Sequence, residues 1–358
     1  MSTPIKARVG VLGAGQLALM LAEAGHQLNI EVICSGRPGD CASRVAPLVE
    51  LDLEDPQAVQ TFSSKVDVLT LESENVETTV LDGLANLAPN SRSVKIAQDR
   101  LFEKDFLRFQ GVQTAPYAEV SSLRDLHHAL ELIGAPSILK TRRLGYDGRG
   151  QVRLTHIDEA ASAWAHMGGA PCILEGMVPF EREVSLIAVR SAKGELAFYP
   201  LVENEHRAGI LRVSHAPFVD QQLQTLAEKH LRAVLLALDY VGVLTVEFFV
   251  VSDKLIANEM APRVHNSGHW TIEGAETSQF ANHLRAILGW PLGSTASQPT
   301  VMLNCIGSMP AEADTASFPA IHRHDYGKAP RTGRKVGHLT IPASETELIE
   351  EWRRRLED

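Results

Sequence analysis

The sequence has few cysteines, and none of them form a closely spaced pair. Four occur in 358 residues, at positions 34, 41, 172 and 305. Zinc ribbons and thioredoxin-like redox sites need two cysteines separated by a short, fixed spacing. Neither kind of site is therefore expected, and we expect reduced, mostly buried thiols as in an intracellular protein.

Long apolar runs are also missing. No segment approaches the roughly 20 apolar residues that span a bilayer. The segment Met1 to Arg8 lacks the apolar core of a signal peptide. The sequence therefore predicts a cytoplasmic protein with no membrane contact.

Positive charge is in deficit, because the formal net charge is −10. Nucleic-acid binding needs a basic field that displaces counterions, so no nucleic-acid partner is expected. Small anions can still bind at local basic clusters. Two such clusters occur, at Lys140 to Arg143 and at Arg331 to Lys335.

The pattern of apolar residues divides the chain into three predicted units. Residues 1–95 alternate buried strands with amphipathic helices, as in Val9 to Leu12 followed by Gln16 to Leu28, which indicates a parallel α/β sheet of the Rossmann type. Residues 96–298 have the mixed α+β pattern of an antiparallel sheet with helices. Residues 299–358 form a small third unit with two predicted strands and a charged helix.

Two segments lack part of a nucleotide-binding motif. Gly13-x-Gly15-x-x-Ala18 lies between a strand and a helix, as a dinucleotide-binding loop does. The second strand, however, ends at Val32 to Gly36 without the acid that would hold a ribose, so a nicotinamide-dependent oxidoreductase is disfavoured. Gly134 to Thr141 ends in Lys-Thr but lacks the glycine that precedes the lysine of a P-loop. A nucleotide site must therefore be built in another way.

A lysine at the end of an apolar strand offers such a site. Ile138-Leu139-Lys140 leads into a loop with Gly145, Gly148 and Gly150. Glycines permit close backbone approach, and the lysine supplies charge to phosphate oxygens. The alternative is a surface hairpin with solvated charges. Farther on, Glu175 ends a short buried strand and could accept from the exocyclic amine of adenine, and Glu183 could bind ribose hydroxyls; exposed charges are again the alternative.

Two glutamates lie inside apolar strand runs, at positions 247 and 259. If Ser252, Asp253 and Lys254 form the loop between the strands, Glu247 and Glu259 face each other, with Cβ atoms about 4.5–5.5 Å apart. Two close carboxylates repel unless one is protonated or a cation lies between them. Mg²⁺ prefers one or two carboxylates together with phosphate oxygens, so we expect a magnesium site, with a protonated or salt-bridged pair as the alternative.

Taken in order, these features resemble the ATP-grasp fold. Three runs carry a closer resemblance: Gly145-Tyr146-Asp147-Gly148-Arg149-Gly150, Ala261-Pro262-Arg263-Val264-His265-Asn266-Ser267-Gly268-His269-Trp270 and Gly333-Arg334-Lys335-Val336-Gly337-His338-Leu339. With Gly13-x-Gly15-Gln16-Leu17 they are similar to the N5-carboxyaminoimidazole ribonucleotide synthetase family of purine biosynthesis. The resemblance covers about residues 9 to 341.

The resemblance implies a fold and a reaction. The fold is an ATP-grasp domain with an N-terminal pre-ATP-grasp domain and a small C-terminal domain. The reaction converts ATP, bicarbonate and 5-aminoimidazole ribonucleotide into ADP, phosphate and the N5-carboxylated ribonucleotide, through carboxyphosphate. Mg²⁺ and a homodimer are also implied.

The resemblance also implies roles for individual residues. Those assigned to ATP are Arg100, Lys140, Gly145, Tyr146, Asp147, Gly148, Arg149, Gly150, Gln151, Glu175, Gly176, Met177, Val178, Glu183, His206, Asn258 and Glu259. Those assigned to Mg²⁺ are Glu247 and Glu259. Those assigned to catalysis on bicarbonate or carboxyphosphate are Arg263, His265 and Asn266, with Lys140. Those assigned to the ribonucleotide and its 5′-phosphate are Gly15, Gln16, Tyr146, Lys328, Arg331, Arg334 and Lys335.

Three alternatives stay open at this point. The run Glu72 to Val76 resembles an acidic run of the family and is predicted either to line the ribonucleotide pocket or to cap a helix. A related ATP-grasp ligase, such as a formate-dependent glycinamide ribonucleotide transformylase, would share much of the pattern, although bicarbonate explains Arg263 to His269 better. A non-catalytic nucleotide-binding regulator would lack Lys140 or one of the glutamates assigned to Mg²⁺, and Lys140, Glu247 and Glu259 are all present.

Overall fold

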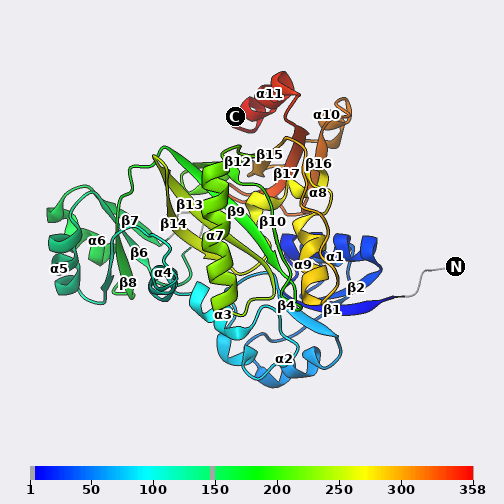
Figure 1. Cartoon of the computed structure of the whole chain (residues 1–358), viewed down its shortest axis with the longest axis horizontal. Coiled ribbons are helices and arrows are strands. Elements are labelled where there is room, and N and C mark those ends of the chain that lie inside the picture. Colours follow the sequence, from blue (N-terminus) through cyan, green and yellow to red (C-terminus); the bar gives the residue numbers. More distant parts are fainter. Residues whose placement is uncertain (1–4, 146–149, 358) are drawn as a thin grey trace.

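A computed structural model describes residues 5–145 and 150–357 of the chain. Its strands form a nine-stranded central sheet and two four-stranded sheets. In Figure 1 the two smaller sheets lie toward opposite ends of the molecule, with the central sheet between them. The expected ATP-grasp architecture, with a parallel sheet at the N-terminus, is confirmed.

The N-terminal sheet is parallel throughout, with the order β3-β2-β1-β4. Its strands are β1 (Ala7–Leu12), β2 (Ile30–Ser35), β3 (Leu48–Val49) and β4 (Val68–Leu71), and its helices are α1 (Gln16–Leu28), α2 (Pro56–Ser63) and α3 (Ser91–Ala97). The apolar residues of α1 pack in one core cluster with those of α9 (Gln279–Ile287). This packing attaches the N-terminal sheet to the rest of the protein.

A second, antiparallel sheet has the order β5-β8-β6-β7. It contains β5 (Tyr117–Val120), β6 (Ser137–Thr141), β7 (Gln151–Leu154) and β8 (Cys172–Gly176), with α5 (Leu123–Ile133) and α6 (Ala160–His166) beside it. These elements share a hydrophobic cluster of their own. The sheet carries Lys140 on β6 and Glu175 on β8. Lys140 pairs with Ile173 and Glu175 pairs with Ile138, so the two charged residues lie diagonally across the β6–β8 ladder.

The central sheet has the order β14-β13-β9-β11-β12-β15-β17-β16, with β10 beside β9. Its strands are β9 (Arg182–Arg190), β10 (Leu196–Phe198), β11 (Val202–Arg207), β12 (Ile210–Ala216), β13 (Gly242–Val251), β14 (Lys254–Ala261), β15 (Thr300–Ile306), β16 (His322–Asp325) and β17 (Lys335–Pro342). Its main helix is α7 (Gln221–Ala237), whose buried face packs on this sheet. Strands β10, β11 and β12 were not predicted from the sequence, because β10 has only three residues and polar side chains interrupt the apolar pattern of β11 and β12.

The third predicted unit continues this sheet, because β15 pairs with β12. Its helices are α10 (Glu312–Ala316) and α11 (Thr346–Glu357), and α11 buries Ile349 and Trp352 against the strands. The remaining helices are α4 (Arg100–Phe109) and α8 (Thr271–Gly274). In the part of the chain that is described, no helix combines the length and the apolar composition needed to cross a bilayer.

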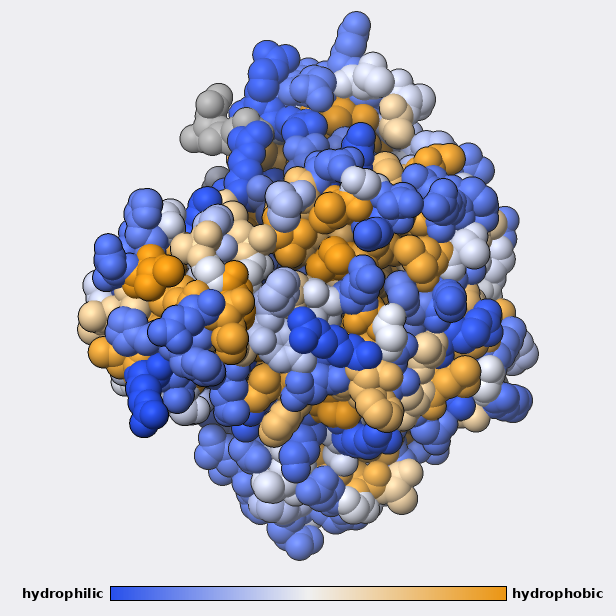
Figure 2. Space-filling model, turned by 60° about the vertical axis from the view of Figure 1, so that its left-hand side comes forward, coloured by the Kyte–Doolittle hydropathy of each residue, from blue (hydrophilic) through white to orange (hydrophobic). Residues whose placement is uncertain are grey.

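The four cysteines are all buried and unpaired, as expected. On the face drawn in Figure 2, apolar residues are interspersed with hydrophilic ones. The most exposed large apolar side chains lie on different elements, for example Phe109 at the end of α4, Leu132 on α5 and Val219 before α7. Scattered exposures of this kind are normal on a protein surface.

Candidate active site

One cavity of about 650 Å³ is lined by residues from the N-terminal unit, the second sheet and the central sheet. The N-terminal unit contributes Gln16 and Glu74, the second sheet contributes Lys140, and the central sheet contributes Glu247 and Lys335. Residues more than 300 positions apart in the sequence therefore meet in one space. The candidate site is this cavity.

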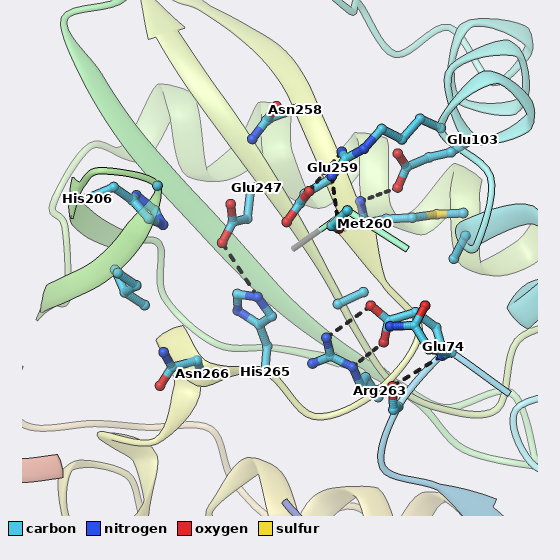
Figure 3. A pocket seen from close by; sticks show the side chains of 18 of the residues that line it. Glu74, Glu103, His206, Glu247, Asn258, Glu259, Met260, Arg263, His265 and Asn266 are labelled. Atoms are coloured by element: carbon cyan, nitrogen blue, oxygen red, sulfur yellow. Dashed lines mark hydrogen bonds and ion pairs between the residues drawn. The ribbon is translucent and has the colours of Figure 1, made fainter. Parts of the chain in front are cut away.

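The β13–β14 hairpin brings the two predicted metal ligands together. Glu247 and Glu259 are register partners, and in Figure 3 their carboxylates point into the same part of the cavity. The predicted three-residue loop is wrong, because Lys254 pairs with Val251 and the turn contains only Ser252 and Asp253. A turn this short would place Glu247 opposite residue 258.

A β-bulge restores the alignment. Phe248 pairs with Ala257 whereas Glu247 pairs with Glu259, so Asn258 is the extra residue on β14. A bulge bends the strand and re-aims the side chains beside it. Asn258 consequently lines the cavity together with Glu259, although strict alternation would turn their side chains to opposite faces.

Helix α4 covers the outer edge of β14 at this bulge. The Arg100 guanidinium lies 3.2 Å from Glu259, and Lys104 Nζ donates to the carbonyl oxygen of Asn258 at 2.7 Å. The backbone N–H of Met260 donates to Glu103 at 2.6 Å. Unpaired backbone groups on an edge strand need partners when they are buried, and Lys104 and Glu103 supply two of them.

The two carboxylates have very different proton affinities. Burial and the neighbouring Glu259 raise the pKa of Glu247 to about 7. Burial also opposes charge on Glu259, but Arg100 and Lys140 lower the pKa of that carboxyl to about 2. Two acids in such contact favour a cation between them.

The donor set fits Mg²⁺. Among the residues that the structure describes, no group of three His, Cys, Asp or Glu side chains is arranged to hold a metal ion. A cation between Glu247 and Glu259 would need further oxygen ligands, which phosphate groups supply. The site therefore suits a magnesium–nucleotide complex better than a metal held by protein alone.

His265 and Asn266 lie on the opposite wall, at a short 3₁₀ turn. The Nδ1 of His265 accepts from the backbone N–H of Ser267 at 3.2 Å, so its Nε2 carries the proton and faces Glu247 at 3.5 Å. Burial and Arg263 lower the pKa of His265 to about 3, which keeps the ring neutral. Both polar atoms of the Asn266 amide are buried without a hydrogen-bond partner, as expected of a group that awaits a small polar ligand.

Arg263 is already paired. Its guanidinium makes two hydrogen bonds to the carboxylate of Glu74, one of them between Nη2 and Oε1 at 3.1 Å. Both residues line the cavity, so Arg263 presents part of its charge there and shares the rest with Glu74. No pattern in the sequence predicts this pairing.

Glu72, in the same acidic run, caps a helix. Its carboxylate accepts from the backbone N–H groups of Gly15 at 2.6 Å and Ala18 at 3.1 Å, at the N-terminus of α1. An acid at this end of a helix satisfies free donors and the helix dipole. Gly15 therefore gives its N–H to Glu72 and does not line the cavity, whereas Gln16 does. Glu72 itself also lines the cavity, so the predicted helix cap is present, while a role of the run in the ribonucleotide pocket stays a prediction.

The predicted nucleotide residues surround one end of the cavity. Lys140 Nζ lies 3.1 Å from Glu175 Oε2, while Glu175 Oε1 is buried without a partner and is free to accept from an amine. His206 Nδ1 and Glu183 form a short hydrogen bond. Burial opposes charge on His206, but the Glu183 carboxylate raises the pKa of its ring.

The cavity collects most of the predicted residues. Those that line it are Gln16, Arg100, Lys140, Gly145, Gln151, Glu183, His206, Glu247, Asn258, Glu259, Arg263, His265, Asn266 and Lys335. Those that do not line it are Gly15, Gly150, Glu175, Gly176, Met177, Val178, Lys328, Arg331 and Arg334. Tyr146, Asp147, Gly148 and Arg149 lie outside the described residues.

Three of the predicted ribonucleotide residues lie elsewhere. Lys328 donates to the side chain of Gln16 at 2.5 Å, beside the cavity. Arg334 donates to the carbonyl of Ala329 at 3.3 Å. Arg331 lines a separate surface depression together with Arg212 and others. Of the basic cluster at residues 331–335, only Lys335 lines the cavity.

Several cavity residues carried no motif. Phe180 and Phe249 stack with their ring centroids 4.6 Å apart, and both line the cavity. Gln98 and Tyr326 also line it. Phe249 could have been identified from the sequence, because it lies two residues after Glu247 on the same face of β13. Gln98, Phe180 and Tyr326 are brought to the cavity only by folding.

Comparisons with known proteins match most of the chain in three parts. Residues 6–98 match the ribonucleotide synthetase preATP-grasp domain, residues 105–280 the ATP-grasp domain, and residues 300–351 the phosphoribosylaminoimidazole carboxylase C-terminal domain. A relative from Pseudomonas aeruginosa, named N5-carboxyaminoimidazole ribonucleotide synthase, is 47% identical over 96% of each chain.

Solved structures agree with these matches. The N5-carboxyaminoimidazole ribonucleotide synthetase of Thermus thermophilus is 48% identical and superposes with a TM-score of 0.91, covering 97% of this chain and 98% of that one. The N5-carboxyaminoimidazole synthase of Aspergillus clavatus, in complex with ADP and 5-aminoimidazole ribonucleotide, is 31% identical with a TM-score of 0.88, covering 99% and 98%.

The raised pKa of Glu247 predicts that cation binding depends on pH. A cation must displace the proton of Glu247, so affinity should rise about tenfold from pH 6 to pH 8. Titration of Mn²⁺ monitored by the electron paramagnetic resonance of the free ion measures this. Glu247→Gln should bind more weakly and lose the pH dependence, while Asp253→Asn, at the tip of the same hairpin, should behave as wild type. Equal affinity at both pH values in the wild type would contradict the assignment.

Proposed function

The chain belongs to the N5-carboxyaminoimidazole ribonucleotide synthase family of ATP-grasp ligases, and we propose on this basis a mechanism built from the residues of its cavity. The enzyme carboxylates 5-aminoimidazole ribonucleotide with bicarbonate at the expense of ATP, in purine biosynthesis. The relatives support this reaction and not the alternative, a formate-dependent transformylase. The observation that carries the mechanism is the unpartnered Asn266 amide beside the Glu247–Glu259 pair.

ATP would lie between the second sheet and the central sheet. Lys140 and Arg100 supply positive charge to the phosphates. Glu175 does not line the cavity, so its expected contact with the adenine amine is not part of this mechanism. The Glu183–His206 pair lies where ribose hydroxyls would bind. Glu247 and Glu259 would hold Mg²⁺, which neutralises charge on the transferring phosphoryl group.

Bicarbonate would lie against Asn266, His265 and Arg263. A small anion needs a cation and neutral donors, and these are the half-engaged guanidinium of Arg263, the Nε2–H of neutral His265 and the free amide of Asn266. This placement would put a bicarbonate oxygen near the ATP phosphates, on the side of the cavity where Glu247 and Glu259 would hold Mg²⁺. Proximity of two bound reactants is itself a large part of catalysis.

Two bond exchanges complete the reaction. A bicarbonate oxygen bonds to the γ-phosphorus as the bond from that phosphorus to ADP breaks, which gives carboxyphosphate. The exocyclic amine of the ribonucleotide then bonds to the carboxyl carbon and loses a proton, while phosphate leaves. Asn266 and Arg263 stabilise the charge on the carboxyphosphate between these steps, and Gln16 and Lys335 face the ribonucleotide side of the cavity.

Two properties stay predictions from the family resemblance. They are a homodimeric state and a location in the cytoplasm. Sedimentation at working concentration tests the first, and the apolar side chains exposed on separate elements do not specify a dimer surface.

The reaction predicts where the bicarbonate oxygen goes. ATP hydrolysis should require both the ribonucleotide and bicarbonate, and with ¹⁸O-labelled bicarbonate one labelled oxygen should appear in the phosphate product, because it is transferred with the phosphoryl group. Mass spectrometry of the phosphate measures this. The carboxylation would be ruled out if ATP hydrolysis required the ribonucleotide but its rate did not depend on bicarbonate. It would also be ruled out if the phosphate product carried no ¹⁸O.

The role of Asn266 predicts a selective defect. Asn266→Ala should lower kcat/KM for bicarbonate about 100-fold, the usual loss for one stabilising donor, while KM for ATP changes by less than about threefold. Steady-state kinetics with each substrate varied in turn measures both values. Gln57→Ala, which removes an exposed amide on α2, is the control and should match wild type. A loss confined to ATP binding would place Asn266 at the nucleotide instead.

A further inference from the structure

A buried lysine next to the cavity has no role in the mechanism above. Lys104 lies on α4 with no exposed side-chain surface, and it does not line the cavity. Its Nζ contacts two acceptors, Glu175 Oε2 at 3.2 Å and the carbonyl oxygen of Asn258 at 2.7 Å. A fully buried charge is retained only where it is paired, so the question is what this pairing does.

Glu175 is shared between two lysines. Lys140 Nζ lies 3.1 Å from the same oxygen, Oε2, that Lys104 contacts. Burial favours the neutral acid, but Lys104 and then Lys140 lower the pKa of Glu175 to about 2. Two positive charges therefore face one negative charge, and the surplus lies on the cavity side, where Lys140 is 12% exposed.

We propose that Lys104 is a positioning residue that keeps Glu175 paired, so that Lys140 can leave this carboxylate and bind the nucleotide phosphates. The inference rests on the role of Lys140 proposed above. Lys104 itself reaches neither substrate nor metal.

The physical reason is the cost of a bare buried carboxylate. Without Lys104, a move of Lys140 toward the phosphates would leave Glu175 charged and unpaired in a buried place, which is strongly unfavourable. Lys140 would then stay on Glu175, and nucleotide binding would weaken. With Lys104 present, one ion pair remains whichever position Lys140 takes.

Arg100 does not replace Lys104 in this role. It is the other cation close enough to influence Glu175, but its guanidinium is engaged with Glu259 at 3.2 Å and with the carbonyl of Gly145 at 3.3 Å. Lys104 also joins strand β8, which carries Glu175, to strand β14, which carries Asn258. The nucleotide lysine and the metal strand are thus held by one side chain.

A double-mutant cycle tests the proposal with the whole enzyme and ADP as the probe. The variants are Lys104→Met, Glu175→Gln and the double variant, and isothermal titration calorimetry in the presence of Mg²⁺ measures the Kd for ADP. Lys104→Met should weaken ADP binding at least tenfold more in the wild-type background than in the Glu175→Gln background, because a neutral residue 175 needs no counter-ion. Loss of the Asn258 contact is common to both backgrounds and cancels in this ratio.

A ratio below tenfold would overturn the proposal, since Lys104 would then act through packing or through Asn258 alone. If Lys104→Met does not fold, the thermal unfolding of the double variant is measured in place of the calorimetric Kd. The double variant should then fold, and failure to fold would also overturn the proposal. Lys95→Met, at an exposed lysine on α3, is the matched control and should bind ADP as wild type does.

Lys140→Met separates this inference from the function on which it rests. It should weaken ADP binding at least tenfold. Unchanged ADP binding in that variant would refute the proposed role of Lys140, and with it the reason for Lys104. Weakened binding together with a small ratio in the cycle would refute the role of Lys104 alone.

Discussion

The opposition of Glu247 and Glu259 is the constraint on which the rest of the site depends. Two carboxylates that face each other across a hairpin repel, and several surrounding side chains reduce that repulsion by compensating the negative charge. Arg100 and Lys140 stabilise the charge of Glu259, and the Nε2–H of His265 faces Glu247. The negative charge that these protein groups leave on the two carboxylates would be neutralised by a divalent cation bound together with phosphates. We propose that this pair of acids, which the protein groups do not satisfy fully, is the cation site.

Three separate sheets are needed to complete this arrangement. The central sheet carries the acids, the second sheet carries Lys140 and Glu175, and the N-terminal unit brings Glu74 to Arg263. Helix α4 lies at their meeting point and contacts β14 through Arg100, Glu103 and Lys104. Nucleotide and bicarbonate would meet along the short segment from Asn258 to His269. This segment contains Glu259, a proposed metal ligand, near its start and the unpartnered amide of Asn266 near its end.

Sequence patterns predicted the elements well where one physical cause dominates. Gln16–Leu28 has strong apolar periodicity, and the helix begins and ends at the predicted residues. The facing of Glu247 and Glu259 was also predicted, but for a wrong reason. The turn is one residue shorter than expected, and the bulge at Asn258 compensates. The strand pattern alone does not fix the position of the bulge, and residues of α4 supply hydrogen-bond partners at the bulged edge.

Long-range pairings lay beyond sequence patterns. The pairing of Arg263 with Glu74 joins residues 189 positions apart, and Lys104 looks like an ordinary helix-surface lysine until β14 and β8 pack against it. Arg331 belongs to the basic cluster at residues 331–335 but lines another depression, so its contact with the ribonucleotide stays a prediction. Motifs identify which residues matter as a group, and only the fold decides which of them share a space.

The most direct test of the cation site is the crystal structure of the enzyme with Mn²⁺ and ADP, with anomalous scattering used to locate the metal. We predict one manganese peak between Glu247 and Glu259, within about 2.0–2.3 Å of an oxygen of each carboxylate and bonded to an ADP phosphate, as expected for a small hard cation. A metal bound elsewhere, or Glu247 and Glu259 in direct contact through a shared proton with nucleotide present, would contradict it.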